Sequence, residues 1–310
     1  DALYVGIAFG AYGLTQALMQ IPLGMASDKF GRRPVIIGGM VLFIIGGVVS
    51  ALATSVDGII VGRVLQGLGA ISAAITAWVA DATRPEVRTR AMAMVGSAIG
   101  LSFAVSLVLS PVMVGQFGLS GLFWAISGLG LVCLLIAAFA IPEYPRAEPI
   151  IQAKASDVLG HKELLRLNFG VFALHFILMT LFVVVPGVLA QIGGFDSGSL
   201  WKVYLPVILV SFAFMIPAVI YTETRKAHKK VLQALVLGLA VVMAFMPLFS
   251  SMLWGMVVFL LLFFAVFNTL EALQPSLVSR VAPADDRGLA MGFDNTTQSL
   301  GVFGGGLAGG

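Results

Sequence analysis

Long apolar segments alternate with short polar segments along the whole chain. Each apolar segment has about 20 residues, which is the length that an α-helix needs to cross the hydrocarbon core of a bilayer. Ten segments meet this condition, and all but one of the loops between them are short. The segments are 3–26, 34–54, 57–83, 91–114, 119–142, 167–190, 201–222, 231–249, 252–279 and 288–310. The pattern predicts an all-α integral membrane protein with ten crossings.

The composition agrees with this prediction. Of the 310 residues, 59% are hydrophobic and only 11% are charged, whereas a soluble domain carries about 25% charged residues. The net charge of +3 is weak support for a nucleic-acid partner, so we expect the lipid bilayer as partner and no nucleic acid. Three histidines and one cysteine are too few and too scattered for a metal site, and we expect no metal and no cofactor.

Basic residues mark one side of the membrane. Every lysine and arginine except Arg63 and Lys202 lies in every second loop. These loops are 27–33, 84–90, 143–166, 223–230 and 280–287. Because lysine and arginine are enriched in cytoplasmic loops, the first crossing is predicted to run from outside to inside.

The longest loop divides the crossings into two groups of five. We therefore predict an N-terminal helical bundle over 1–142, a cytoplasmic linker over 143–166 and a C-terminal helical bundle over 167–310. Within the linker, SDVLGHKELLRL is typical of a short amphipathic helix on the membrane surface. A faint internal repeat relates RTRAMAM (88–94) to RGLAMGF (287–293), and each copy follows a basic loop. Two parallel halves are the layout of one large class of transporters.

Two local motifs carry a family resemblance. GMASDKFGRRP (24–34) resembles the signature loop between the second and third helices of the Major Facilitator Superfamily, through Gly24, Asp28, Arg32 and Arg33. RVLQGLGA (63–70) is similar to the fourth-helix signature of that family. The resemblance implies two pseudo-symmetric bundles of six helices, of which the second to eleventh are present here, with the first and the last missing.

Further stretches resemble the bacterial YajR-type branch of the drug/proton antiporters. They are YGLTQALMQIPLGMASD, LRLNFGVFALHF, LWKVYL and FNTLEALQPSLVS. This resemblance implies a multi-pass protein of the bacterial inner membrane that exports small amphipathic compounds in exchange for protons, and we expect a monomer. The fifth helix departs from the usual antiporter motif because Ser110 stands before Pro111. A proton symporter for a metabolite or sugar therefore stays open as the alternative.

The same resemblance gives the charges of residues 24–34 a second role besides topology. It implies that Arg32 pairs with Asp81 at the cytoplasmic end of the fourth-helix segment. It also implies that Asp28 faces the N-terminus of the helix that starts near Gly288, where free backbone N–H groups favour an anion. Such a contact would join the two halves only while the inner face is closed. We call it the Asp28 latch.

Four ionisable residues lie inside the predicted crossings, where they are costly and mark functional sites. Arg63 is the fourth-helix arginine that the resemblance links to proton transfer; alternatively it reaches the membrane interface. Glu271, His175 and Asp294 fall at similar depth in the cytoplasmic part of the second half. A buried carboxyl beside a histidine can take up and release protons.

Each of these residues has an alternative role. For His175 it is a neutral core histidine bonded to a carbonyl, and for Asp294 it is exposure at the helix mouth or support of the Asp28 latch. Asn268 lies one turn before Glu271 and can contact substrate or that carboxyl. Gln66, from the fourth-helix motif, is the second candidate for the cavity wall.

Other protein classes find little support. The chain has no HExxH, GxSxG or GxxxxGK[ST] motif, so we expect no enzyme and no nucleotide-driven pump. A receptor on the same fold stays open, because fold does not determine function. Buried proton-binding groups favour transport of a small-molecule substrate coupled to protons.

Overall fold

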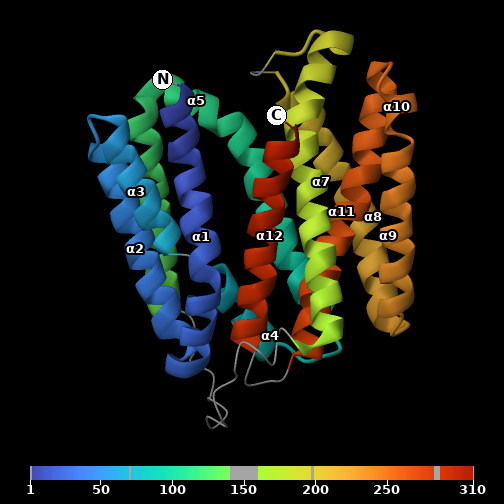
Figure 1. Ribbon diagram of the computed structural model, residues 1–310, viewed down its shortest axis with the longest axis horizontal. Helices are drawn as coiled ribbons and strands as arrows, with labels where there is room; N and C mark the ends of the chain where they lie inside the picture. The colour runs from blue at the N-terminus through green and yellow to red at the C-terminus, as the bar shows by residue number, and fades with distance from the viewer. Residues whose placement is uncertain (1, 70, 140–159, 197–198, 283–286, 310) are drawn as a thin grey trace.

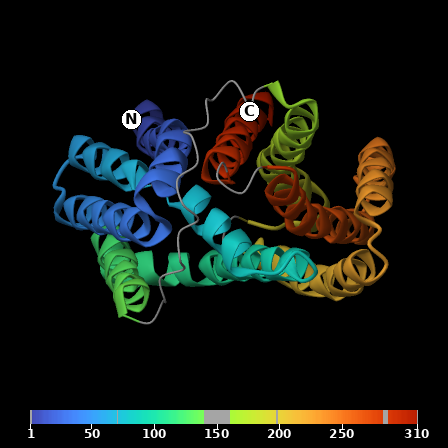
Figure 2. The same cartoon turned by 90° about the horizontal axis from the view of Figure 1, so that it is seen from below.

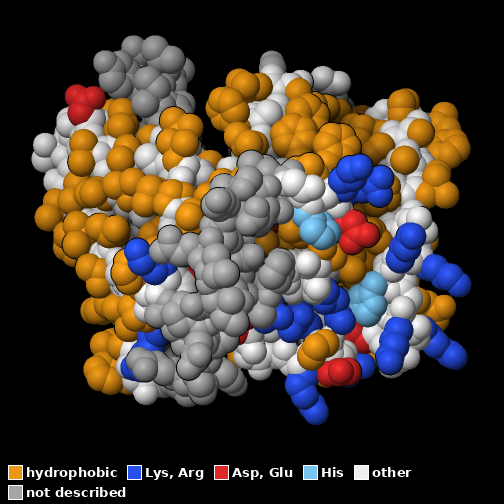
Figure 3. Space-filling model, turned by 60° about the horizontal axis from the view of Figure 1, so that its bottom comes forward, with side chains coloured by type: hydrophobic (Ala, Val, Ile, Leu, Met, Phe, Trp, Pro, Cys, Tyr) orange, Lys and Arg blue, Asp and Glu red, His pale blue; other side chains and the backbone are white. Residues whose placement is uncertain are grey.

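The computed structural model describes residues 2–69, 71–139, 160–196, 199–282 and 287–309, with side chains from residue 11 onward except those of 104, 107 and 111. All elements in this part of the chain are helices. Basic side chains gather on the lower face of the molecule, whereas apolar side chains cover the band above it (Figure 3). The loops at the bottom of Figure 1 are therefore those predicted to be cytoplasmic.

The N-terminal half begins with two long helices, α1 (Ala2–Phe30) and α2 (Arg32–Leu52). Gly31, at φ 99°, makes the tight connection between them, because only glycine adopts this conformation without strain. The predicted crossing over 57–83 is divided into α3 (Val56–Leu68) and α4 (Ser72–Ala82). The Ser55 side chain caps α3 by accepting a hydrogen bond from the backbone N–H of Gly58.

The next two predicted crossings form one bent helix, α5 (Arg88–Phe139). The bend lies at Gly118, whose φ of 67° and ψ of −177° are not helical. A positive φ at this place is open to glycine and strained for other residues. The two arms on either side of Gly118 take the places of the predicted crossings 91–114 and 119–142.

The C-terminal half begins with α7 (Lys162–Gly193) and α8 (Trp201–Thr224). It continues through α9 (His228–Ala244), the short α10 (Met246–Phe249), α11 (Leu253–Val281) and α12 (Arg287–Gly309). The prediction of a separate amphipathic helix in the linker is wrong from Lys162 onward, since these residues are the first turns of α7. Its earlier part, up to residue 159, lies outside the described residues.

Several pairs of helices join the halves. Seen from below, α1 lies beside α12, and the first arm of α5 lies beside α8 (Figure 2). α5 also packs against α11, and α4 packs against α12. The largest buried cluster lies within the C-terminal half, where α11 contributes Met256, Phe259 and Phe263 to contacts with α7 and α8.

Seven helical segments among the described residues are long and apolar enough to cross a membrane. They are Arg32–Leu52, Val56–Ala82, Arg88–Ser110, Val112–Phe139, Lys162–Gly193, Trp201–Thr224 and Leu253–Val281. The other three predicted crossings correspond to α1, to α9 with α10, and to α12. The fold is therefore an all-α membrane bundle, as the sequence predicts.

Candidate functional site

The two halves approach most closely where glycines of α1 and α12 face each other. A Cβ on Gly24 would collide with the carbonyl oxygen of Gly288, and a Cβ on Gly288 would meet the carbonyl oxygen of Gly24. One helical turn further along, Gly292 lies against the backbone of Gln20. These positions need glycine because the two backbones are in contact, which is the usual way in which membrane helices pack tightly.

Asp28 lies at this crossing and bonds to the first turn of α12. Its Oδ1 accepts a hydrogen bond from the backbone N–H of Gly288 at 3.0 Å, and its Oδ2 accepts one from Leu289 at 2.9 Å. Arg32 Nη1 is 2.5 Å from Asp28 Oδ1. Burial raises the pKa of Asp28, while Arg32 and the two backbone N–H groups oppose this rise. The carboxylate therefore has partners from both halves of the protein.

Asp81 extends this contact through the end of α4. Arg32 Nη2 lies 3.0 Å from one carboxylate oxygen of Asp81, and Arg287 Nη1 of α12 lies 2.8 Å from the other. Arg33 donates instead to the backbone carbonyl of Ala138, at the end of α5. Asp28, Arg32 and Asp81 thus belong to one network across the halves, whereas the Arg33 contact lies within the N-terminal half.

A second contact between the halves joins α5 to α8. Glu223, near the end of α8, accepts a hydrogen bond from the backbone N–H of Arg90 at 3.0 Å. The Arg90 Nε also lies 2.6 Å from Glu223 Oε2, and the Glu223 side chain is only 2% exposed. Beside this pair, Thr89 shares a hydrogen bond of 2.8 Å with Ser276 of α11 and contacts His228. This group was not singled out from the sequence, because Glu223 stands among loop residues that read as solvated.

Glu271 and His175 meet inside the C-terminal half. His175 on α7 is 3% exposed, and its Nε2 is 3.3 Å from Oε2 of Glu271 on α11. The same Nε2 is 2.8 Å from the side-chain Nε2 of Gln298 on α12, and the His175 Nδ1 is 3.0 Å from the carbonyl of Val171. Three helices therefore converge on one imidazole. It makes the hydrogen bond to a backbone carbonyl that is expected of a neutral core histidine, and it also lies beside a carboxyl group.

Asp294 belongs to the same interior. It is 4% exposed, so the alternative of an exposed position at the helix mouth is wrong. Its Oδ1 has no hydrogen-bond partner among the described residues. Asp294 also lies close enough to Glu271 for the two carboxyl charges to interact. Two titratable carboxyls and an imidazole thus occupy one buried region.

The remaining candidates lie apart from this group. Arg63 packs its guanidinium on the Tyr12 ring, 4.3 Å from the centroid, and donates to Gln66 Oε1 at 3.1 Å. These contacts are both within the N-terminal half. Asn268 donates to the Ser211 hydroxyl of α8 at 2.7 Å. Within the described residues no hydrogen bond joins this amide to Glu271, although both residues are on α11.

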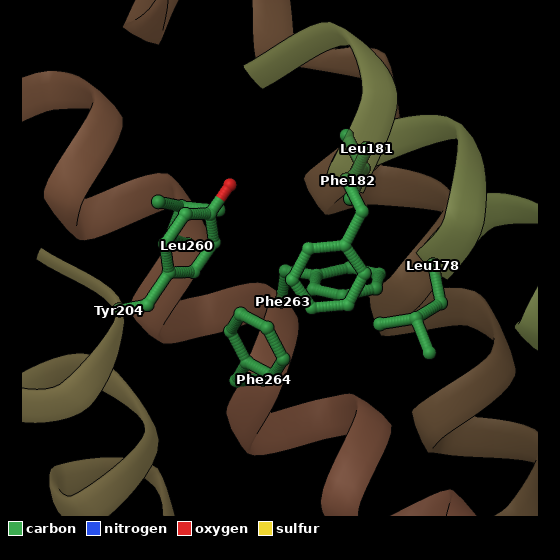
Figure 4. A pocket seen from close by; sticks show the side chains of 7 residues that line it. All are labelled: Leu178, Leu181, Phe182, Tyr204, Leu260, Phe263 and Phe264. Carbon is green, nitrogen blue, oxygen red and sulfur yellow. The ribbon is translucent and has the colours of Figure 1, made fainter. Parts of the chain in front are cut away.

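An aromatic cluster lies beside the imidazole. The apolar side chains shown in Figure 4 pack so closely that they leave no room for a water molecule. These residues are Leu178, Leu181, Phe182, Tyr204, Leu260, Phe263 and Phe264. Phe103 of α5 approaches it across the boundary between the halves, with its ring centroid 5.1 Å from that of Phe182. Pockets for drug-sized ligands have about 300–1,000 Å³, so this cluster is closed to such a ligand in the present conformation.

Comparison with known proteins agrees with these features. The family model described as "Major Facilitator Superfamily" matches residues 1–306. The inner membrane transport protein YajR of Escherichia coli is 44% identical over 313 residues, which cover 99% of this chain and 68% of that protein. The multidrug resistance protein MdtL of Shigella flexneri is 26% identical over 257 residues, covering 80% and 66% of the two chains.

A solved structure shows the same fold. The human organic anion transporter MFSD10 superposes with a TM-score of 0.76 at 21% identity, and the match covers 98% of this chain and 76% of that one. The match to the family model, the identity to an inner-membrane transporter and the helical architecture agree with one another. The chain is a multi-pass inner-membrane transporter, not an enzyme, and it belongs to the Major Facilitator Superfamily.

Proposed function

We propose that this transporter is driven by protons and exports small amphipathic compounds in exchange for them, working as a monomer by alternating access. The observation that carries the proposal is the buried group of Glu271, His175 and Asp294. Ionisable residues inside a membrane protein are costly and line the paths of ions and protons. Paired titratable groups in a low dielectric can bind a proton in one state and release it in another.

Exchange, as opposed to co-transport, draws support from the relatives. MdtL is named a multidrug resistance protein, which fits export of foreign compounds. The apolar and aromatic surroundings of the group favour a substrate with an apolar body. Substrate and proton would bind in the C-terminal half alternately, as the two halves rock about a central site.

The Asp28 latch fits the same cycle. We assign it to the state in which the cytoplasmic face is closed, because Asp28 bonds to α12 only while α1 and α12 are in contact. Opening that face separates the carboxylate from Gly288 and Leu289. The latch would therefore favour the outward-open state.

The test uses the full-length protein in liposomes with an imposed pH gradient. We would record proton movement on adding lipophilic compounds, for the wild type, for Glu271→Gln and for the control Glu163→Gln. Glu163 is exposed in the first turn of α7, so its substitution should leave transport unchanged. We expect substrate-triggered proton efflux in the wild type and the control and none in Glu271→Gln. Proton and substrate moving in the same direction would refute exchange, and normal coupling in Glu271→Gln would refute the role of Glu271.

A further inference from the structure

The hydrogen bonds around His175 determine which of its nitrogens titrates. Nδ1 lies 3.0 Å from the carbonyl oxygen of Val171, one turn earlier on α7. A carbonyl oxygen only accepts hydrogen bonds, so Nδ1 carries a hydrogen whether the ring is neutral or charged. Nε2 is therefore the atom that gains or loses the proton.

Two neighbours compete for this Nε2. The amide nitrogen of Gln298 is 2.8 Å away and donates, which requires the free lone pair of a neutral ring. The Oε2 of Glu271 is 3.3 Å away. When ionised it accepts, which requires an N–H on a charged ring, and when protonated it donates to the same lone pair that Gln298 uses. One nitrogen cannot satisfy both at once. The shorter contact, to Gln298, corresponds to neutral His175.

We propose that Gln298 is a positioning residue that keeps His175 neutral while the inner face is closed, so that Glu271 holds the exchangeable proton. The inference rests on the proposed proton coupling and adds a residue to it. Transfer of the proton breaks the O–H bond of Glu271 and forms the N–H bond of His175, which leaves a carboxylate and an imidazolium. The Gln298 amide must then turn its NH₂ away from Nε2.

The helix that carries Gln298 is also the helix held by the latch. Asp28 binds the first turn of α12, and the Thr296 hydroxyl donates to the Ala17 carbonyl of α1 at 3.0 Å. Separation of α1 from α12 removes both contacts and frees α12 to shift against α7. The position of Gln298 thus links closure of the inner face to the protonation state of His175.

The helices packed against α7 supply the other groups around the imidazole. α11 contributes Glu271 and the Phe267 ring, whose edge-on contact with His175 has a centroid distance of 5.7 Å. α12 contributes Gln298 and, one turn earlier, Asp294. Both titratable neighbours are acids, which favour the charged imidazole when ionised. The Gln298 donor is the contact that favours the neutral ring.

The experiment reads the protonation state of His175 directly. Full-length protein labelled with ¹⁵N-histidine in nanodiscs would be measured by NMR across a pH series, and the His175 signal would be identified by its loss in His175→Gln. In the wild type at neutral pH we expect Nδ1 protonated and Nε2 unprotonated. In Gln298→Met, which keeps the length but not the donor, we expect the imidazolium fraction at a given pH to rise by about tenfold, the effect of about one hydrogen bond. Ser299→Ala, whose hydroxyl bonds within α12, is the matched control.

Two results would overturn the inference: an imidazolium in the wild type at neutral pH, or the same titration in Gln298→Met as in the wild type. If Gln298→Met does not yield folded protein, Gln298→Glu serves instead. An added carboxylate should raise the imidazolium fraction further, and an unchanged fraction would again refute the role of Gln298. Because NMR needs no transport, this outcome is separate from the liposome test, in which loss of coupling in Glu271→Gln reports on the proposed function.

Discussion

Substitution of Asp28 by asparagine tests how strongly the latch holds the inner face closed. Asparagine keeps the size of the side chain but replaces one of the two accepting oxygens by an NH₂ group and removes the charge. A hydrogen bond to a charged group contributes about 1.5–3 kcal/mol, and two backbone N–H groups of α12 bond to this carboxylate. The burial that raises the pKa of Asp28 shows that desolvation offsets part of this gain. We therefore expect a net loss of about 1–2 kcal/mol, which is roughly a 5–30-fold change in the ratio of closed to open forms.

Distances between spin labels on the two halves measure this ratio. In full-length protein with Cys133→Ser, labels on exposed Arg84 and Lys229 would report separation of the cytoplasmic ends. Asp28→Asn should increase the long-distance population, and Asp57→Asn, in an exposed first turn of α3, should not. An unchanged ratio in Asp28→Asn, or a shift toward the closed form, would show that the burial cost of the carboxylate equals or exceeds the strength of its contacts. The latch would then not stabilise the closed inner face.

Three further predictions concern the cytoplasmic side. Glu223→Gln removes the charge from the contact between α8 and α5, and hydrogen exchange at the start of α5 should become faster by the equivalent of about 1–3 kcal/mol; unchanged exchange would show that the pair contributes nothing. Burial is the main cause that lowers the pKa of His228 in the folded protein. As the pH falls below about 6.5, the opened or unfolded protein therefore binds a proton on His228 before the folded protein does. The thermal midpoint should therefore fall between about pH 7.5 and pH 5.5, and His228→Gln should reduce that fall; an equal fall in the variant would contradict the assignment. Gly24→Ala should weaken closure by about 1–3 kcal/mol in the spin-label assay because its Cβ would meet the backbone of α12. Gly38→Ala, which has open space around it, should not.

The crossings could be predicted because apolar length depends only on the sequence. The bends could not, since hydropathy does not tell which glycine adopts a positive φ, and Gly118 looks like many others in the chain. The start of α7 was placed too late for a related reason. Residues from Lys162 onward are polar, yet a helix extends beyond the hydrocarbon core wherever its backbone bonds continue.

Only the ionisable residues of the candidate site could be predicted from the sequence. Glu271, His175 and Asp294 stand out because ionisable residues are rare in apolar helices. Gln298 carries no charge, and its meeting with His175 depends on how α12 packs against α7. Depth along a helix also does not determine which way a side chain faces. For that reason the burial of Asp294 and the bond from Asn268 to Ser211 became visible only in three dimensions.

Asp28 and Glu223 each bind to one of the two copies of the internal repeat. Each acid lies near the C-terminal end of a helix of one half, Asp28 in α1 and Glu223 in α8. Each accepts a hydrogen bond from a backbone N–H at the start of a helix in the other half, that of Leu289 and that of Arg90. Leu289 is the third residue of RGLAMGF, and Arg90 is the third residue of RTRAMAM. Each half therefore supplies the acid that binds free backbone N–H groups at a helix start of the other half. A double-mutant cycle on the two acids should therefore show cooperativity, because breaking either contact already loosens the surface on which the other depends.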